Sequence, residues 1–221
     1  IIIDYIKNII WMKIKLTNKL IVSDYTPPLI VAEISANHNG SKKRFLNHII
    51  KAKQAGADLI KIQTYEENDI SFDLSNLKKS NLKNHYEIYK KSKTKYEWHQ
   101  EAFKLAKSIK IPIFSSPFSL KAVEILEILK VKAYKVASGE VTNLPLLKKL
   151  NQTGKLVFLS SGMSNFKEID NAIKIFTNKK KICLMQCTSM YPCPDKYVGI
   201  NVYSEFKKRY KINCMYWNAS N

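Results

Sequence analysis

Six short apolar runs, each followed by an amphipathic helical pattern, constrain the fold of this chain more than any other feature. The runs are LIVAEIS (29–35), LIKIQT (59–64), IPIFSSP (111–117), AYKVAS (133–138), KLVFLSS (155–161) and ICLMQCT (182–188). The helical patterns lie near 41–55, 96–109, 119–130, 143–152, 165–176 and 202–210. Apolar runs that alternate with helices are typical of buried parallel strands in βαβ units. The pattern therefore predicts an α/β protein, either an open doubly wound sheet or a (β/α)8 barrel.

Polar residues end every one of these runs, and this favours the barrel. In a closed barrel all strand carboxyl ends meet at one rim, where active sites form. In an open sheet, strands far from the switch point have little reason to carry such residues. We therefore predict an incomplete TIM (β/α)8-type barrel with about six of eight strands. A seventh strand is expected to begin near Ile212, and no eighth is expected.

The chain divides into three expected segments. Residues 1–11 are interpreted as upstream read-through before a natural start at Met12, 12–28 as a lysine-rich lead-in, and 29–221 as a partial catalytic barrel. The polar connection 66–95 is too long for a passive linker and is predicted to be a substrate-side lid or subdomain. Disorder is the alternative for its middle, NLKKSNLK.

The formal net charge of +19, from 37 Lys and Arg against 18 Asp and Glu, raises the question of a polyanionic partner. The lysines are dispersed over helical patterns, and no basic helix, zinc pattern or aromatic RNA-binding motif is present, so we expect no nucleic-acid partner. The apolar start is interrupted by Asp4 and Lys7 and is too short to span a membrane. The four cysteines are expected to be reduced thiols in a cytoplasmic protein.

The polar strand ends suit a small anion with several oxygens. Two lysines, Lys61 and Lys135, stand with the hydroxyls of Ser116, Ser138 and Ser160. A lysine within an apolar strand is costly unless it meets an anion or opens to the barrel mouth, whereas any single serine is explained by bonding to a strand-end backbone group.

Two carboxylates at the same strand ends, Glu33 and Glu140, are candidates for proton transfer. Two other functions stay open at this point. A Schiff-base aldolase would use Lys61 or Lys135 as its nucleophile. A non-enzymatic basic binding protein would use the charge alone.

Six motifs in order, AEISANHNG, AGADLIKIQTY, FSSPF, AYKVASGE, SSGM and CTSMYP, resemble the sialic acid synthase family. These are the phosphoenolpyruvate-dependent synthases of N-acetylneuraminate, legionaminate and pseudaminate. The resemblance runs from about Met12 to about Ile212, and six ordered motifs are far more specific than one.

The resemblance implies that phosphoenolpyruvate condenses with the aldehyde of an N-acylated sugar, with a divalent metal (Mn²⁺ or Mg²⁺) polarising the aldehyde. It implies a homodimer for the complete enzyme. By motif match, Glu33 and Glu140 would manage protons. Phosphoenolpyruvate would be held by Lys61, Ser116, Lys135, Ser138, Ser160 and Ser189, and the sugar by Gln63, Tyr191 and Asn37.

The sequence departs from the family pattern at several places. Ser116 and Ser161 stand where Thr is common, and Gln186 stands where His or Lys is usual, which puts that contact in doubt. The segment INCMYWNASN does not match the seventh strand, and the family's two metal-binding histidines and its small antifreeze-like C-terminal domain are missing. His48 and His99 fall in helical patterns and are expected to be solvated or packed. We therefore expect no metal ligands in this chain, and an inactive fragment.

Overall fold

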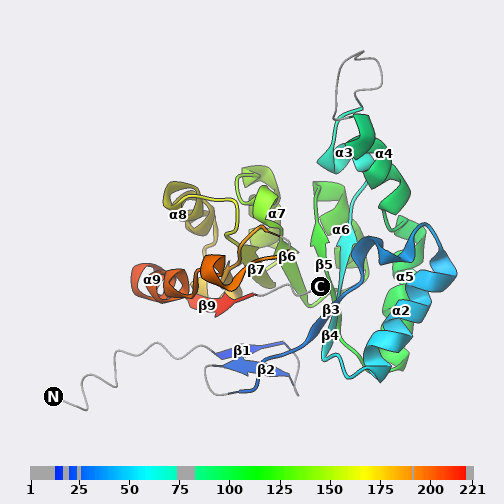
Figure 1. The fold of residues 1–221 in the computed structure, drawn as a ribbon, viewed down its shortest axis with the longest axis horizontal. Coiled ribbons are helices and arrows are strands. Elements are labelled where there is room, and N and C mark those ends of the chain that lie inside the picture. Colours follow the sequence, from blue (N-terminus) through cyan, green and yellow to red (C-terminus); the bar gives the residue numbers. More distant parts are fainter. Residues whose placement is uncertain (1–12, 17–19, 24–25, 74–82, 191, 218–221) are drawn as a thin grey trace. The chain divides into compact units, whose positions relative to one another are not determined.

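The computed structural model describes residues 13–16, 20–23, 26–73, 83–190 and 192–217 (Figure 1). The chain forms two compact units, one of residues 29–134 and one of residues 1–28 with 135–221. We refer to them as the 29–134 unit and the 135–221 unit. The expected read-through segment 1–11 lies outside the described residues.

The parallel βα arrangement predicted from the apolar runs is confirmed. Seven strands follow one another in chain order in one sheet, as in a partial (β/α)8 barrel, and the first four pair in parallel, as do the last three. They are β3 (Val31–Glu33), β4 (Leu59–Thr64), β5 (Ile113–Pro117), β6 (Ala133–Val136), β7 (Leu156–Ser160), β8 (Ile182–Gln186) and β9 (Asn213–Tyr216).

The seventh strand expected near Ile212 is present as β9, after the six strands that the apolar runs predicted. Strand β9 pairs with β8 in the register Cys183↔Asn213 to Gln186↔Tyr216, although its sequence lacks the family motif. A strand needs only a neighbouring edge and alternating burial, not a motif. Ile212 and Cys214, two positions apart, supply that alternation because both are buried.

The lead-in contains a feature that its sequence did not predict. Strands β1 (Lys13–Lys15) and β2 (Ile21–Ser23) pair antiparallel in a separate two-stranded sheet. Only Ile14 is buried in this hairpin among the described residues. So little burial explains why its sequence carries a weak strand signal.

In the 29–134 unit, two of the helices pack against one face of a central strand. Its helices are η1 (Ser35–His38), α2 (Lys42–Gln54), α3 (Glu67–Ile70), α4 (Lys83–Ser92), α5 (Tyr96–Ser108) and α6 (Leu120–Ile128). Ile60 and Ile62 of β4 pack in one cluster with Phe45 of α2 and Ala102 of α5, and the two helices run side by side in Figure 1. Because strand side chains alternate, Lys61 and the other odd-numbered residues of β4 take the opposite face.

The 135–221 unit also buries its strands. Its helices are η2 (Ser138–Glu140), α7 (Leu144–Gln152), α8 (Phe166–Ile175), η3 (Lys179–Lys181), η4 (Asp195–Tyr197) and α9 (Ile200–Tyr210). Every residue of β7 and β8 is buried. Helix α7 packs against α8, and α9 packs against β8 and β9 with Phe206 in its contact face.

Caps and turns bound the helices within two residues of the sequence-based limits. The Ser41 hydroxyl accepts from the Arg44 N–H at 3.2 Å and begins α2. Three lysines that directly follow a helix or its last turn have backbone φ angles in the left-handed region: Lys110 (φ 57°), Lys130 (φ 56°) and Lys211 (φ 51°). These three turns lead from a helix into a strand and so lie at the amino ends of the strands, opposite the polar ends.

The connection 66–95 contains α3 and α4, as a lid or subdomain would require. Residues 74–82 lie outside the described part of the chain. The disorder prediction for NLKKSNLK (76–83) therefore falls almost wholly outside it.

Candidate functional site

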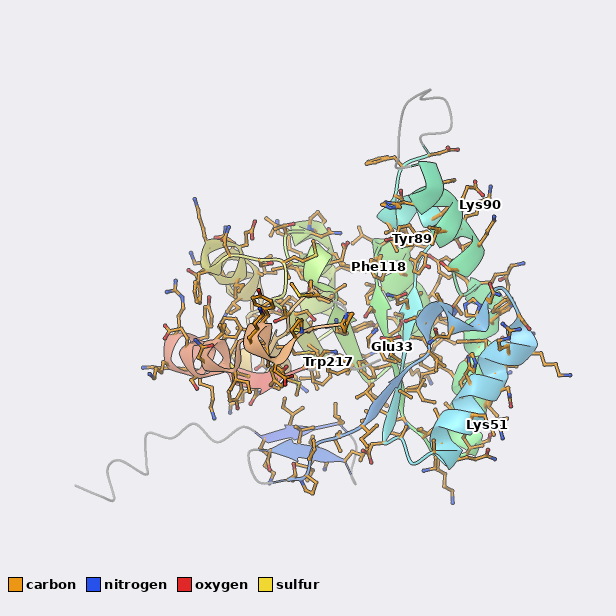
Figure 2. All side chains as sticks on the ribbon, in the orientation of Figure 1. Glu33, Lys51, Tyr89, Lys90, Phe118 and Trp217 are labelled. Carbon is orange, nitrogen blue, oxygen red and sulfur yellow. The ribbon has the colours of Figure 1, made fainter. Side chains whose placement is uncertain are left out.

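Two predicted site residues of the 29–134 unit form an ion pair. Glu33 and Lys61 are register partners on β3 and β4, and their side chains meet (Glu33 is labelled in Figure 2). The Lys61 side chain is 6% exposed, whereas the Glu33 side chain is 41% exposed. The pair therefore sets one buried cation beside one solvated carboxylate that can exchange protons with water. An ion-paired ammonium suits anion binding better than it suits the neutral amine that a Schiff base needs.

The Glu33 carboxylate is held from the loop that follows it. Its Oε1 accepts hydrogen bonds from the Ser35 N–H at 3.2 Å and from the Ser35 hydroxyl. The Asn37 amide, a predicted sugar ligand, donates to the Glu33 carbonyl oxygen at 3.3 Å and is exposed. The first strand end is thus organised around Glu33.

Ser116 of β5 is a buried hydroxyl without a hydrogen-bond partner among the described residues. It is 1% exposed and pairs in register with Gln63, two positions beyond Lys61. Residues two apart on a strand share a face, so Lys61, Gln63 and Ser116 lie on the face away from the helices. An unsatisfied buried hydroxyl is costly and is rare in native structures. Ser116 therefore has the free bonding capacity that a ligand would use.

Its neighbour Ser115 behaves in the opposite way. The Ser115 hydroxyl lies 2.6 Å from Thr64 Oγ1 and 3.2 Å from the Ile62 carbonyl oxygen, and Thr64 Oγ1 lies 2.9 Å from Nε2 of His99. The packed role expected for His99 is confirmed, since it is fully buried on α5. Sequence reasoning did not find this network, although Thr64 and Ser115 are polar residues at helix-facing positions.

His38, in the loop that follows Glu33, faces the protein interior. It is fully buried, and its ring packs edge-on against Phe45 and Trp98. Its Nε2 lies 3.1 Å from Thr94 Oγ1, and its Nδ1 accepts from the Gly40 N–H. Packing against these two rings and the bond to Gly40 fix the loop after β3 to the interior of the unit.

Acid is expected to destabilise the chain through these two histidines. Burial lowers the pKa of His38, with a further contribution from His48, and burial lowers the pKa of His99. The unfolded chain binds these protons near pH 6.5, so stability is present above that pH and is lost as pH falls below it. Urea midpoints measured from pH 7.5 to 5.0 should fall, and His99→Gln should flatten the slope. His85→Gln, at an exposed position, should not, and equal slopes in all three would contradict the expectation.

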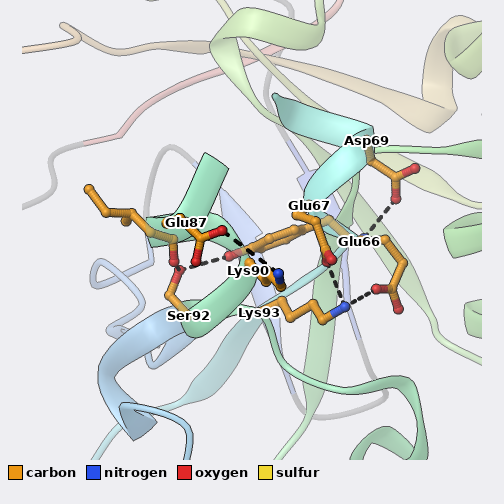
Figure 3. A network of polar contacts seen from close by, with 9 residues as sticks. Glu66, Glu67, Asp69, Glu87, Lys90, Ser92 and Lys93 are labelled. Atoms are coloured by element: carbon orange, nitrogen blue, oxygen red, sulfur yellow. Dashed lines mark hydrogen bonds and ion pairs between the residues drawn. The ribbon is translucent and has the colours of Figure 1, made fainter. Parts of the chain in front are cut away.

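Polar contacts join the beginning and the end of the connection that follows β4 (Figure 3). Lys93 Nζ bonds to the carboxylates of Glu66 and Glu67, the latter at 2.6 Å. Desolvation opposes charge on Lys93, but the two carboxylates outweigh it and raise its pKa. Tyr65, 2% exposed, bonds to Ser92 at 3.2 Å. Residues 65–67 and 92–93 are therefore held together next to the carboxyl end of β4, the strand that carries Lys61.

In the 135–221 unit, three oxygen atoms lie close to Gly162, and two of them belong to predicted site residues. A Cβ on Gly162 would lie 2.7 Å from Ser189 Oγ, 2.9 Å from the Cys187 carbonyl oxygen and 3.0 Å from Ser138 Oγ. Ser138 Oγ also lies 3.6 Å from Cys187 Sγ. Two predicted phosphoenolpyruvate ligands, Ser138 and Ser189, are thus brought together, and only glycine fits between them.

The second Ser-Ser pair repeats the contrast of the first. Ser160 is fully buried and its hydroxyl has no hydrogen-bond partner among the described residues. Ser161 donates to the Met185 carbonyl oxygen at 2.9 Å and lies 3.4 Å from Gln186 Oε1. Gln186 also reaches the Val198 carbonyl oxygen at 3.5 Å, so this departure from the family pattern holds the loop after β8.

The remaining predicted residues of this unit have mixed surroundings. Lys135 Nζ lies 6.0 Å from the centroid of the Trp217 ring, just after β9 (Figure 2). Glu140 accepts from the Asn143 amide at 2.7 Å, at the start of α7. Sequence reasoning missed Trp217, and only the position of β9 reveals it. Tyr191 lies outside the described residues.

The expected divalent metal has no ligand set in the described residues, where no group of three or more His, Cys, Asp or Glu could hold an ion. The four cysteines are free thiols. Within the described segments no helix has the length and apolar character needed to cross a membrane.

Comparison with known proteins agrees with the resemblance. Residues 48–217 match the NeuB family. The chain is 40% identical over 177 residues to the pseudaminic acid synthase of Helicobacter pylori, covering 75% of the chain and 51% of that protein. It is 33% identical over 198 residues to the N,N'-diacetyllegionaminic acid synthase of Campylobacter jejuni, covering 85% and 59%. It thus spans about half the length of the curated relatives it matches.

A solved structure supports the fold. The N-acetylneuraminic acid synthetase of Leptospira borgpetersenii superposes with a TM-score of 0.81 at 24% identity, covering 93% of this chain and 70% of that one. At that identity the likeness bears on the fold alone. The sequence matches, which take in most of the chain, identify it as a member of the NeuB family.

Proposed function

We propose that this chain carries the phosphoenolpyruvate-binding residues of a nonulosonate synthase. The reaction is the condensation of phosphoenolpyruvate with the open-chain aldehyde of an N-acylated amino sugar, giving a nine-carbon 2-keto acid and phosphate. Membership of the NeuB family supports the proposal, as do relatives named as pseudaminic and legionaminic acid synthases. The resemblance further implies a cytoplasmic homodimer for the whole enzyme.

The observation that carries the proposal is the contrast within the two Ser-Ser pairs. In each unit one hydroxyl of the pair is bonded to protein, and the other is buried with no described protein partner. Hydrogen bonds to bound substrate would explain each of these unsatisfied hydroxyls, which stand at the predicted ligand positions Ser116 and Ser160. Lys61 supplies buried positive charge on the same strand face as Ser116.

The chemistry requires three events that these residues suit. C3 of phosphoenolpyruvate attacks the aldehyde carbon, and the new alkoxide takes up a proton. Water attacks C2 and loses a proton, and phosphate leaves as the C2–O bond breaks. Lys61, Lys135 and the serines would hold the phosphate and carboxylate oxygens. Glu33, solvated and beside Lys61, and Glu140 are proposed to carry the protons.

Alanine substitution at the unpartnered serines provides the test. Ser116→Ala and Ser160→Ala remove buried hydroxyls that make no described protein hydrogen bond, so the free energy of unfolding should stay the same or rise, by up to about 1–3 kcal/mol. Phosphoenolpyruvate affinity, measured by calorimetry on the full chain, should weaken by about tenfold or more.

Ser161→Ala is the matched control because that hydroxyl is already bonded to Met185. It should cost about 1 kcal/mol of unfolding free energy and leave the affinity near that of the parent chain. A parent chain that does not bind phosphoenolpyruvate, or serine variants that bind as well as the parent, would refute the assignment.

A further inference from the structure

A buried chain of hydroxyl and imidazole groups lies directly behind two of the proposed ligands. It runs from Ser115 on β5 through Thr64 on β4 to His99 on α5, with contacts of 2.6 Å and 2.9 Å. His99 Nδ1 lies 3.1 Å from the Lys95 carbonyl oxygen. All three linked side chains are fully buried. The chain thus ties two strands and one helix together at a single level of the 29–134 unit.

Its hydrogen bonds have one consistent direction. A carbonyl oxygen only accepts, so the proton on His99 sits on Nδ1 and Nε2 is an acceptor. Thr64 therefore donates to Nε2, and the single Ser115 proton is shared between the Thr64 oxygen at 2.6 Å and the Ile62 carbonyl oxygen at 3.2 Å. Every polar atom of the linked side chains has a partner, which makes such a network rigid.

The network reinforces the last main-chain pairing between β4 and β5. Thr64 is the register partner of Pro117, and its carbonyl oxygen accepts from the Phe118 N–H at 3.3 Å. One residue before them, Gln63 is the register partner of Ser116. Side-chain bonds from Thr64 and Ser115 therefore add to the attachment of the two strand ends next to the proposed ligands.

We propose that Thr64, Ser115 and His99 are positioning residues that hold Ser116 and Gln63 in the geometry needed for substrate. Thr64 and Ser115 face the helices, and their immediate neighbours Gln63 and Ser116 face the opposite side. A shift of one strand end against the other would move both ligands, and misplacement by about 1 Å has large effects on binding and catalysis. The inference rests on the proposed function, which it deepens.

The experiment compares three variants of the full chain. Thr64→Val keeps the shape of the side chain but removes the hydroxyl at the centre of the network, whereas Thr64→Ser retains the hydroxyl. Thr94→Val is the matched control, because it removes another buried threonine hydroxyl bonded to a buried histidine, His38, elsewhere in the same unit. Calorimetry with phosphoenolpyruvate reports affinity, and amide hydrogen exchange of 62–64 and 115–116 reports the order of the strand ends.

Thr64→Val should weaken phosphoenolpyruvate binding by roughly five- to twentyfold and speed exchange at these amides. Thr64→Ser should stay within about twofold of the parent chain. Thr94→Val should lose stability but keep both the affinity and the exchange rates at 62–64 and 115–116. Parent affinity and unchanged exchange in Thr64→Val would overturn the inference. If the parent chain does not bind, the proposed function fails, and exchange alone decides whether Thr64 orders the strand ends.

Discussion

Lys61→Met is expected to lower the affinity of the full chain for phosphoenolpyruvate by about a hundredfold, equivalent to about 2.7 kcal/mol. Methionine fills nearly the same space in the strand but brings neither charge nor donor. Hydrogen bonds to a charged group contribute about 1.5–3 kcal/mol each, and Lys61 is the buried cation beside Ser116. Calorimetry gives the affinity, and thermal melting gives the stability.

The fold should survive this substitution. Removing one partner of a fully buried ion pair leaves a stranded charge and is strongly destabilising. Here the other partner, Glu33, is 41% exposed and keeps much of its hydration. The matched control is Lys42→Met, which breaks the surface pair of Lys42 with Glu101 and should change neither affinity nor melting. Binding within twofold of the parent chain in Lys61→Met would remove Lys61 from the anion site.

Gly162→Ala is expected to damage the 135–221 unit in two ways at once. The new methyl group would meet Ser189 Oγ, the Cys187 carbonyl oxygen and Ser138 Oγ at 3.0 Å or less, and a backbone atom among them cannot rotate away. Overpacking of this kind costs about 1–3 kcal/mol of unfolding free energy. Because two proposed ligands are displaced, phosphoenolpyruvate affinity should also fall by at least about tenfold.

Gly139→Ala separates this effect from a general intolerance of glycine replacement. A Cβ on Gly139 meets no atom within 4 Å, although Gly139 directly follows Ser138. Urea unfolding and calorimetry should find this variant close to the parent chain. If Gly162→Ala unfolds and binds as Gly139→Ala does, the crowding around Gly162 has no bearing on the anion site.

Much of the fold could be predicted because buried parallel strands leave a strong local signal. The six apolar runs correspond to β3 to β8, and their polar ends gave Glu33, Lys61 and Ser116 as candidate site residues. The ion pair between the first two needed the register of β3 against β4, which no local pattern contains. The seventh strand was expected near Ile212, and alternating burial is sufficient to form it there without the family motif.

The parts that could not be predicted depend on contacts between distant residues. Thr64 and His99 are 35 positions apart, and only the packing of α5 on β4 brings them together. His38 stands five residues after Glu33, yet the turn of η1 sends it into the apolar layer between Phe45 and Trp98. Sequence proximity to a ligand is therefore a poor guide once the chain leaves a strand.

The three lysines with left-handed backbone conformation after α5, α6 and α9 contribute to the high net positive charge of this chain. A side chain in that region costs about 1–2 kcal/mol relative to glycine, and glycine does occupy the equivalent turns after α2 and α7, at Gly56 and Gly154. Lysine thus appears even where backbone geometry favours another residue and where no proposed ligand lies. These three charges lie at the amino ends of the strands, so they add to the net charge of +19 without serving the proposed anion site at the opposite strand ends.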